Sequence, residues 1–128
     1  MSAPEVGDRA PVRLLVTGDL IFSTKITGSA RLLGLDVRVV SSASAALARI
    51  RSDSPQCILL DLSVSSLTPD LIREIVLAAS GKPVVAFGSH VDTARLDAAR
   101  AAGCTAVMPR SRFSAELPEL LKQYLCDK

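Results

Sequence analysis

The stretch QCILLDLS, residues 56–63, is a short apolar run that ends in one carboxylate, Asp61. A proline precedes it and a serine-rich segment follows, which is typical of a strand that is buried on both faces. In open parallel sheets, ligands bind just beyond the carboxyl ends of the strands. We therefore expect Asp61 to lie at the mouth of a sheet, outside its core, as a helix cap or a functional carboxylate.

The composition excludes several classes of protein. With 128 residues, 48% of them hydrophobic and 22% charged, the chain has the size and balance of one globular domain. The chain has four aromatic residues of the Phe and Tyr types and no Trp, too few for a base-stacking surface. Its net charge of +2 is too small for binding to a phosphate backbone. No apolar run is long enough to span a membrane. We expect a cytoplasmic protein, a monomer or weak dimer, without nucleic-acid or membrane partners.

The cysteines and the single histidine do not form a recognisable site in the sequence. Cys57, Cys104 and Cys126 are widely spaced and contain no CxxC pair. They are interpreted as small apolar residues of a reducing compartment. His90 has no Cys or His at ligand spacing, so a surface loop is the expected position for it.

Four more apolar runs share the pattern of residues 57–61, and helical periodicity separates all five. Residues 1–11 are turn-rich and are predicted to form a flexible lead-in, and residues 12–128 to form a single domain. The expected strands lie at residues 12–17, 36–40, 57–61, 83–87 and 105–108. The expected helices follow them at about residues 20–33, 43–51, 69–80, 93–102 and 114–125. This alternation predicts an α/β fold, a five-stranded parallel sheet in a doubly wound (βα)5, flavodoxin-like three-layer sandwich.

Local signals set several boundaries of these elements. Thr68 followed by Pro69 is a strong helix start, and glycines stop the helices that precede the second, fourth and fifth strands. Residues 36–40 alternate only partly, which favours a position near the sheet edge. Ser114 is expected to open the last helix, although Pro118 fits only a first turn and allows a start one or two residues later.

Charged side chains converge at the expected strand ends. Strands one and three are neighbours in a doubly wound sheet, so Asp19 and Asp61 could face each other. A divalent cation or the basic side chain of Arg110, which follows strand five, would relieve their repulsion. Asp19 could equally cap the first helix, and Arg110 could form a permanent salt bridge with either acid.

On these residues the chain resembles the receiver domain of bacterial response regulators, of the chemotaxis (CheY-like) type. The resemblance covers about residues 12–125 in element order and spacing. It is carried by Leu14-Leu15-Val16-Thr17-Gly18-Asp19, Ile58-Leu59-Leu60-Asp61-Leu62, Lys82-Pro83-Val84-Val85-Ala86 and Ala101-Ala102-Gly103-Cys104. It implies that Asp61 takes the place of the phosphoryl acceptor. It also implies that Asp19, Asp61 and the carbonyl of Ser63 would hold Mg²⁺.

The chain departs from the family pattern at the same site. Gly18 replaces the first of the paired acids, and Gly88 replaces the Thr or Ser that contacts the phosphoryl group, with Ser89 one residue later as a candidate substitute. Arg110 replaces the family's lysine and Ser111 the proline after it. Other departures are Val107 at the switch aromatic and Val64-Ser65-Ser66-Leu67 in the loop after the acceptor.

These departures predict a pseudo-receiver. Loss of one carboxylate weakens a Mg²⁺ site, and a planar guanidinium is not equivalent to a compact ammonium in phosphoryl transfer. We therefore expect a stand-alone module of two-component phosphorelay signalling that is not an enzyme, with weakened or lost Mg²⁺-dependent phosphorylation of Asp61. Its expected partner is a sensor kinase or a downstream signalling protein. The resemblance places the contact on the fourth helix, fifth strand and fifth helix, at residues such as Arg95, Arg112, Glu119, Lys122 and Tyr124.

Two other readings stay open. The arginines that flank Ser111 could bind a phosphate or a partner's carboxylate, or Arg112 could simply be solvated. The chain could also be a flavodoxin-like domain that binds a small ligand and has no part in phosphotransfer, because a fold does not fix a function. Gly18-Asp19 after strand one is acidic, and no GxGxxG follows any strand, which disfavours a flavin phosphate or dinucleotide. A hydrolase is disfavoured because His90 has no nucleophile-elbow serine.

Overall fold

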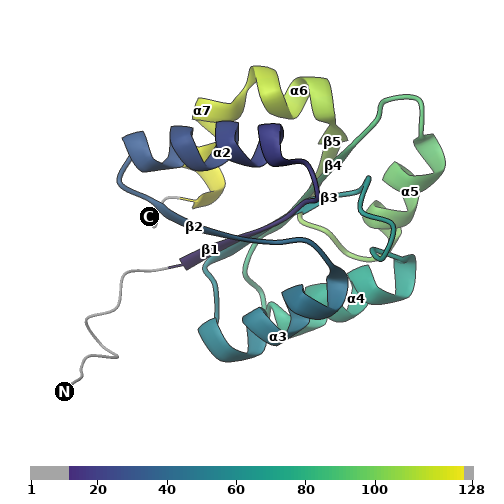
Figure 1. Ribbon diagram of the computed structural model, residues 1–128. Helices are drawn as coiled ribbons and strands as arrows, with labels where there is room; N and C mark the ends of the chain where they lie inside the picture. The colour runs from purple at the N-terminus through teal and green to yellow at the C-terminus, as the bar shows by residue number, and fades with distance from the viewer. Residues whose placement is uncertain (1–11, 126–128) are drawn as a thin grey trace.

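Five parallel strands form the middle layer of the protein, as the computed structural model shows for residues 12–125, the part of the chain that it describes (Figure 1). They are β1 (Val12–Val16), β2 (Asp36–Val40), β3 (Cys57–Asp61), β4 (Val84–Gly88) and β5 (Ala106–Pro109). Their order is β2-β1-β3-β4-β5. The predicted doubly wound sheet is therefore confirmed, with β1 beside β3 and β2 at an edge.

Helices cover both faces of this sheet. They are α2 (Leu20–Leu32), α3 (Ala43–Asp53), α4 (Pro69–Ala78), α5 (Thr93–Ala101), α6 (Arg110–Ala115) and α7 (Leu117–Leu120), followed by a π-helical turn, η1 (Leu121–Leu125). In Figure 1, α2, α6 and α7 lie on one side of the sheet and α3, α4 and α5 on the other. No helix within residues 12–125 is long and apolar enough to cross a membrane.

The strands alternate between two separate apolar cores. Leu14 and Val16 pack into the core under α3, α4 and α5, whereas Leu15 belongs to the core under α2, α6 and α7. Successive side chains of a strand point to opposite faces, so a residue's parity decides which core it joins. Cys57 and Leu59 join the second core, and Asp61 has their parity.

The predicted helix signals operate at the expected residues. Thr68 caps α4, with its side chain accepting the amide hydrogen of Leu71, and Asp92 caps α5 in the same way. Gly103 has φ +103°, and its missing Cβ would lie 3.3 Å from Val76. That position after α5 therefore favours glycine on two grounds, backbone angle and space.

The predicted start of the last helix is wrong, and two prolines explain the difference. The helix begins at Arg110, four residues before Ser114, because Pro109 has no N–H with which to extend the ladder and its φ of −64° leads into a helix. The helix then ends at Glu116, whose φ is −104°, and α7 begins anew. Pro118 requires this break, since in a continuous helix it would lack the hydrogen bond to the carbonyl of Ser114.

Candidate functional site

Asp61 is the last residue of β3 and lies opposite Phe87 of β4. The predicted position at the carboxyl end of the strand is correct, but the expectation that its side chain lies outside the core is wrong. The side chain of Asp61 has no exposed surface. Its parity directs it to the core under α2 and α6, where neighbouring side chains cover it.

Four donors saturate the carboxylate of Asp61. The hydroxyl of Thr17 donates to Oδ2 at 2.6 Å, and Ser63 donates to Oδ1 from its backbone N–H at 3.0 Å and from its hydroxyl at 2.7 Å. Nη2 of Arg110 donates to the same Oδ1 at 2.6 Å and completes an ion pair. The negative charge is thus compensated by one cation and three neutral donors, as a buried carboxylate requires.

Aromatic rings fix the guanidinium of Arg110 over this carboxylate. Its central carbon lies 4.8 Å from the ring centroid of Phe22 and 5.5 Å from that of Phe87. The rings of Phe87 and Phe113 stack at 4.2 Å between centroids. Nη2 also donates to the hydroxyl of Ser63 at 3.2 Å. Ring faces attract a guanidinium, so the rings and the carboxylate hold Arg110 in one orientation.

Asp19 is used as a helix cap. Its Oδ1 accepts the amide hydrogen of Phe22 at 2.9 Å at the start of α2. The structure contains no hydrogen bond between Asp19 and Asp61, and Thr17 links them indirectly, since its hydroxyl accepts the amide hydrogen of Asp19 at 3.1 Å. Of the two roles considered for Asp19, helix cap and acid facing Asp61, the structure shows the helix cap.

The residues at this site do not fit a resident divalent cation. Across residues 12–125, no three side chains of the His, Cys, Asp and Glu types come together as metal ligands. Asp61 holds a guanidinium, Asp19 faces a helix N-terminus, and Gly18 contributes no ligand from its side chain. Mg²⁺ needs several oxygen ligands in octahedral geometry. A cation at Oδ1 of Asp61 would also lie against the positive charge of Arg110.

The end of β4 offers no hydroxyl to the carboxylate. A Cβ on Gly88 would lie 3.2 Å from the Cβ of Leu62, closer than side chains normally approach. The exposed Ser89 uses its hydroxyl in its own loop, where it accepts the amide hydrogen of Val91 at 3.4 Å. Neither residue contacts Asp61, so the predicted substitute hydroxyl is not among its partners.

Thr17 and Phe22 were not among the site residues inferred from the sequence. Thr17 directly follows β1 and in the parallel register comes opposite Asp61. The sequence did contain a signal for Thr17. It is a polar residue at the end of an apolar strand, and the neighbouring strand ends in a carboxylate. Phe22 had no comparable signal, because an aromatic residue on the inner face of a helix is ordinary core.

The residues expected on the partner face have different environments. Arg112, Glu119 and Lys122 are exposed, and Arg112 forms an ion pair of 3.4 Å with Glu116. Arg95 is half-buried and donates from Nη1 to the carbonyl of Leu62. The side chain of Tyr124 lies outside the described part of the structure.

A second feature of the sheet edge is an open hollow lined largely by serines. It has a volume of about 700 Å³ and lies at the carboxyl ends of β1, β2 and β3. Its lining residues are Gly18, Asp19, Ser41, Ser42, Ser63, Val64, Ser65 and Ser66. This is where ligands of doubly wound sheets bind, although Asp19 would repel an anion.

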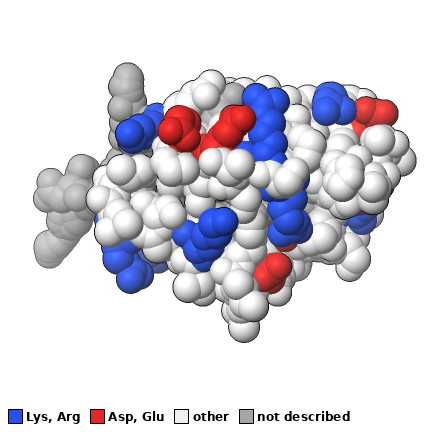
Figure 2. Space-filling model, turned by 90° about the horizontal axis from the view of Figure 1, so that it is seen from above, with Lys and Arg blue, Asp and Glu red and all other residues white. Residues whose placement is uncertain are grey.

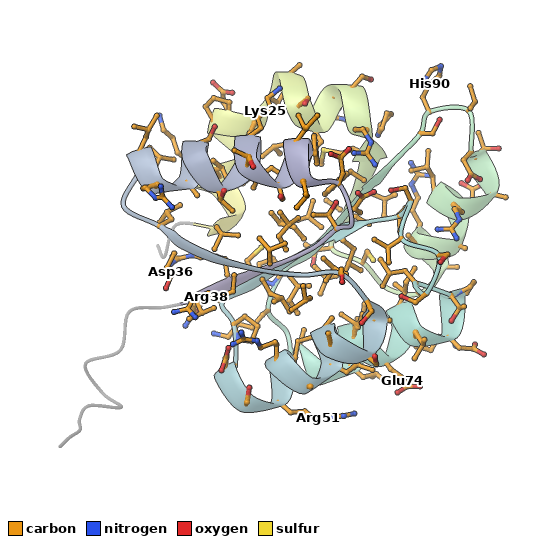
Figure 3. The ribbon with its side chains drawn as sticks, viewed as in Figure 1. Lys25, Asp36, Arg38, Arg51, Glu74 and His90 are labelled. Atoms are coloured by element: carbon orange, nitrogen blue, oxygen red, sulfur yellow. The ribbon has the colours of Figure 1, made fainter. Side chains whose placement is uncertain are left out.

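The two described cysteines have the character of apolar residues. Burial raises the pKa of the Cys57 thiol to about 12 and that of Cys104 to about 11, so both are thiols at neutral pH. Cys126 lies outside the described residues. His90 is exposed in the loop after β4 (Figure 3), where the sequence placed it.

Comparison with solved structures identifies the architecture. A putative response regulator from Chloroflexus aurantiacus superposes with a TM-score of 0.78 at 19% identity, over 91% of this chain and 98% of that one. The chain has the receiver fold. The receiver domain of a sensor histidine kinase from Pseudomonas aeruginosa, with magnesium coordinated in its active-site cleft, matches with a TM-score of 0.77 at 22% identity, over 91% and 98% of the two chains.

The structural likeness includes metal-bound receivers, whereas comparison by sequence finds no match. The Mn²⁺-bound form of the response regulator Rcp1 matches this receiver fold with a TM-score of 0.74 at 17% identity, over 93% of this chain and 96% of that one. No protein-family model matches the sequence, and no curated protein matches it. The predicted receiver-like fold is therefore confirmed by structure alone.

Proposed function

We propose that this chain is a cytoplasmic receiver-like module of two-component signalling that acts by protein–protein contact and does not become phosphorylated at Asp61. One observation carries the proposal, namely the saturation of the buried Asp61 carboxylate by Arg110, Thr17 and Ser63. To attack a phosphorus atom, an oxygen of Asp61 would have to break short hydrogen bonds and leave the cover of Arg110. The module is then a binding protein and not an enzyme.

The remaining parts of the site support this proposal. In phosphoryl transfer, a cation must neutralise charge on the transferred group. Here the residues do not fit Mg²⁺, and the guanidinium of Arg110 is already paired with Asp61. The close approach of Gly88 to Leu62 also leaves little space for a hydroxyl-bearing side chain at that position, since Leu62 would have to shift to admit a Cβ. A phosphorylation signal would therefore have neither its cation nor its hydroxyl contact.

We propose α5, β5 and the C-terminal helical segment of α6, α7 and η1 as the face that meets the partner, a sensor kinase or a downstream signalling protein. The exposed residues Arg112, Glu119 and Lys122 give this face mixed charge. Because Arg110 opens α6 and is fixed by Asp61, the ion pair sets the position of the first turn of this face. The contact surface would be held in one state without a covalent switch.

Intact-mass analysis after incubation with acetyl phosphate and Mg²⁺ tests the proposal. Three samples are compared: the natural chain, Asp61→Asn and Arg110→Lys, with a phosphorylatable receiver as a positive control. We expect no added phosphoryl group on the natural chain. A gain of one phosphoryl group that Asp61→Asn abolishes would overturn the proposal. A gain in Arg110→Lys alone would support it, because it would identify the guanidinium as the block.

The alternative is a small-ligand-binding domain of flavodoxin-like architecture, and the serine-lined hollow of about 700 Å³ favours it. Its ligand would be neutral and rich in hydroxyl groups, because the serines offer hydrogen bonds and Asp19 disfavours anions. A sugar or polyol that raises the midpoint of thermal unfolding in proportion to the logarithm of its concentration would support it. The variant Ser42→Ala should then reduce this effect.

A further inference from the structure

Two basic side chains, Lys25 of α2 and Arg110 of α6, lie along the groove between these helices, one helical turn apart. On α2, Phe22 and Lys25 are three residues apart and share a face, and on α6 Arg110 and Ser114 are four residues apart and do the same. The guanidinium carbon of Arg110 lies 4.8 Å from the ring centroid of Phe22, and Nζ of Lys25 donates to the hydroxyl of Ser114 at 3.1 Å. Lys25 of α2 and Arg110 of α6 thus each contact a residue of the opposite helix.

An open hollow of about 470 Å³ adjoins these charges. Its lining residues are Phe22, Ser89, His90, Arg110, Ser111 and Ser114. Among these there is a guanidinium and three serine hydroxyls, and within the described part of the chain no Asp or Glu lines the hollow. In Figure 3, His90 lies on the loop after β4 with its ring toward solvent, and Lys25 projects from α2.

Arg110 keeps unused donors in this groove although Asp61 pairs with its charge, and Lys25 has no acidic partner among the described residues. Both hydrogen bonds of Arg110 to residues 12–125 come from Nη2, which leaves its Nη1 and Nε hydrogens unused on a side chain that is 30% exposed. Lys25 has no carboxylate within 4.0 Å among the described residues. Elsewhere on the surface, arginines form ion pairs with acids, for example Arg38, Arg49, Arg100 and Arg112.

Asp61 orients Arg110 without blocking the groove. It has no exposed surface and is not among the residues that line the hollow. The carboxylate therefore holds the guanidinium through Nη2, and the Arg110 side chain remains 30% exposed. A guanidinium group that is already oriented loses little conformational entropy when a ligand binds. Figure 2 shows this side of the molecule, on which Lys and Arg side chains, several Asp and Glu side chains and uncharged areas are all visible.

We infer that the groove between α2 and α6 binds a phosphate group non-covalently, through Arg110, Lys25 and the serine hydroxyls. Together with Asp61, the cations Arg110 and Lys25 leave one net positive charge, which attracts an anion, and phosphate oxygens suit the unused N–H groups of a guanidinium. The ligand class is a phosphate monoester or inorganic phosphate. The site uses the guanidinium that the Asp61 carboxylate orients, so the inference rests on the unphosphorylated state of Asp61 in the proposed function.

Titration of the ¹⁵N-labelled full chain, followed by NMR, tests the inference. Inorganic phosphate is the first probe, with chloride at equal ionic strength as the reference. We expect saturable shifts of the backbone amides of Ser111 and Ser114. The variant Lys25→Ala should raise the Kd for phosphate about threefold, within the range of exposed charge interactions. Lys82→Ala is the matched control, since its Nζ also makes a single hydrogen bond, of 3.1 Å to Gln56, and it should leave the Kd unchanged.

A second titration distinguishes the source of the phosphate. If a phosphoserine peptide binds at least about tenfold more tightly than free phosphate, and its unphosphorylated form does not bind, the ligand belongs to a protein partner. Equal or weaker binding of the peptide assigns the site to a small phosphate. Shifts that remain linear up to about 50 mM phosphate, a concentration well above any specific Kd of interest, would overturn the inference. So would equal weakening by Lys25→Ala and Lys82→Ala.

Discussion

Replacement of Arg110 by alanine should destabilise the whole domain, although Arg110 lies in a short helix at the surface. The substitution leaves the carboxylate of Asp61 in the core with three neutral donors and no cation. It also removes the guanidinium from the faces of Phe22 and Phe87. Both losses act at the carboxyl end of β3, beside the second core.

The expected loss follows from the exposure of the pair. Removal of one partner from a fully buried ion pair costs about 3–5 kcal/mol. The Arg110 side chain is 30% exposed, so water can reach the vacated position, and we take about half of that value. The lost contacts with the rings add about 0.5–1 kcal/mol. The free energy of unfolding should therefore fall by about 2–3.5 kcal/mol.

Urea unfolding followed by circular dichroism measures this change, with an unchanged m-value as the criterion for an intact fold. Arg112→Ala is the control, because its side chain is 61% exposed and its partner Glu116 is 48% exposed. The control should change stability by less than about 0.5 kcal/mol. If Arg110→Ala is as mild as the control, the ion pair does not stabilise the site and our reasoning is wrong. A double-mutant cycle with Asp61→Asn should give a coupling of about 1–2 kcal/mol.

Three further perturbations test other parts of the structure. Thr17→Val removes a buried donor from Asp61 and should lower the free energy of unfolding by about 1–2 kcal/mol in the same urea assay. Gly103→Ala should lower the midpoint of thermal unfolding, because Gly103 has a φ of +103°. Gly28→Ala should raise the free energy of unfolding by about 0.5–1 kcal/mol, because Gly28 lies inside α2 and no atom is near the added Cβ. The opposite order of the two variants would contradict the backbone assignment. Burial raises the pKa of Cys57 to about 12, so iodoacetamide should leave it unmodified at pH 8 in the folded chain and modify it after unfolding, as peptide mass mapping will show.

The sheet could be predicted from the sequence because its signals are local. A buried strand shows as a continuous apolar run, and the edge strand β2 shows as partial alternation. Helix starts and stops depend on single residues such as Thr68 and Gly103. The position of Asp61 at the end of β3 followed from the same pattern. Each of these inferences needs only neighbours within a few residues.

The burial of Asp61 could not be predicted, because it depends on residues far along the chain. Arg110 is 49 residues away and Thr17 is 44 residues away. Whether Arg110 covers the carboxylate depends on where α6 begins, and that boundary was predicted four residues too late. Pro109 was the overlooked signal, since a proline that ends an edge strand can also begin a helix.

The separation of Arg110 from Asp61 along the chain has a consequence for the order of folding. During synthesis, β1, Thr17, β3 and Ser63 all emerge before Arg110, the only cation that contacts Asp61 in the described structure, which follows Asp61 by 49 residues. A partly made chain that has paired its first strands would therefore carry, at the end of β3, a carboxylate with no cation beside it. Completion of α6 and closure of the sheet centre become one late event, so that loss of the helix in the folded protein should release Asp61 before any strand separates.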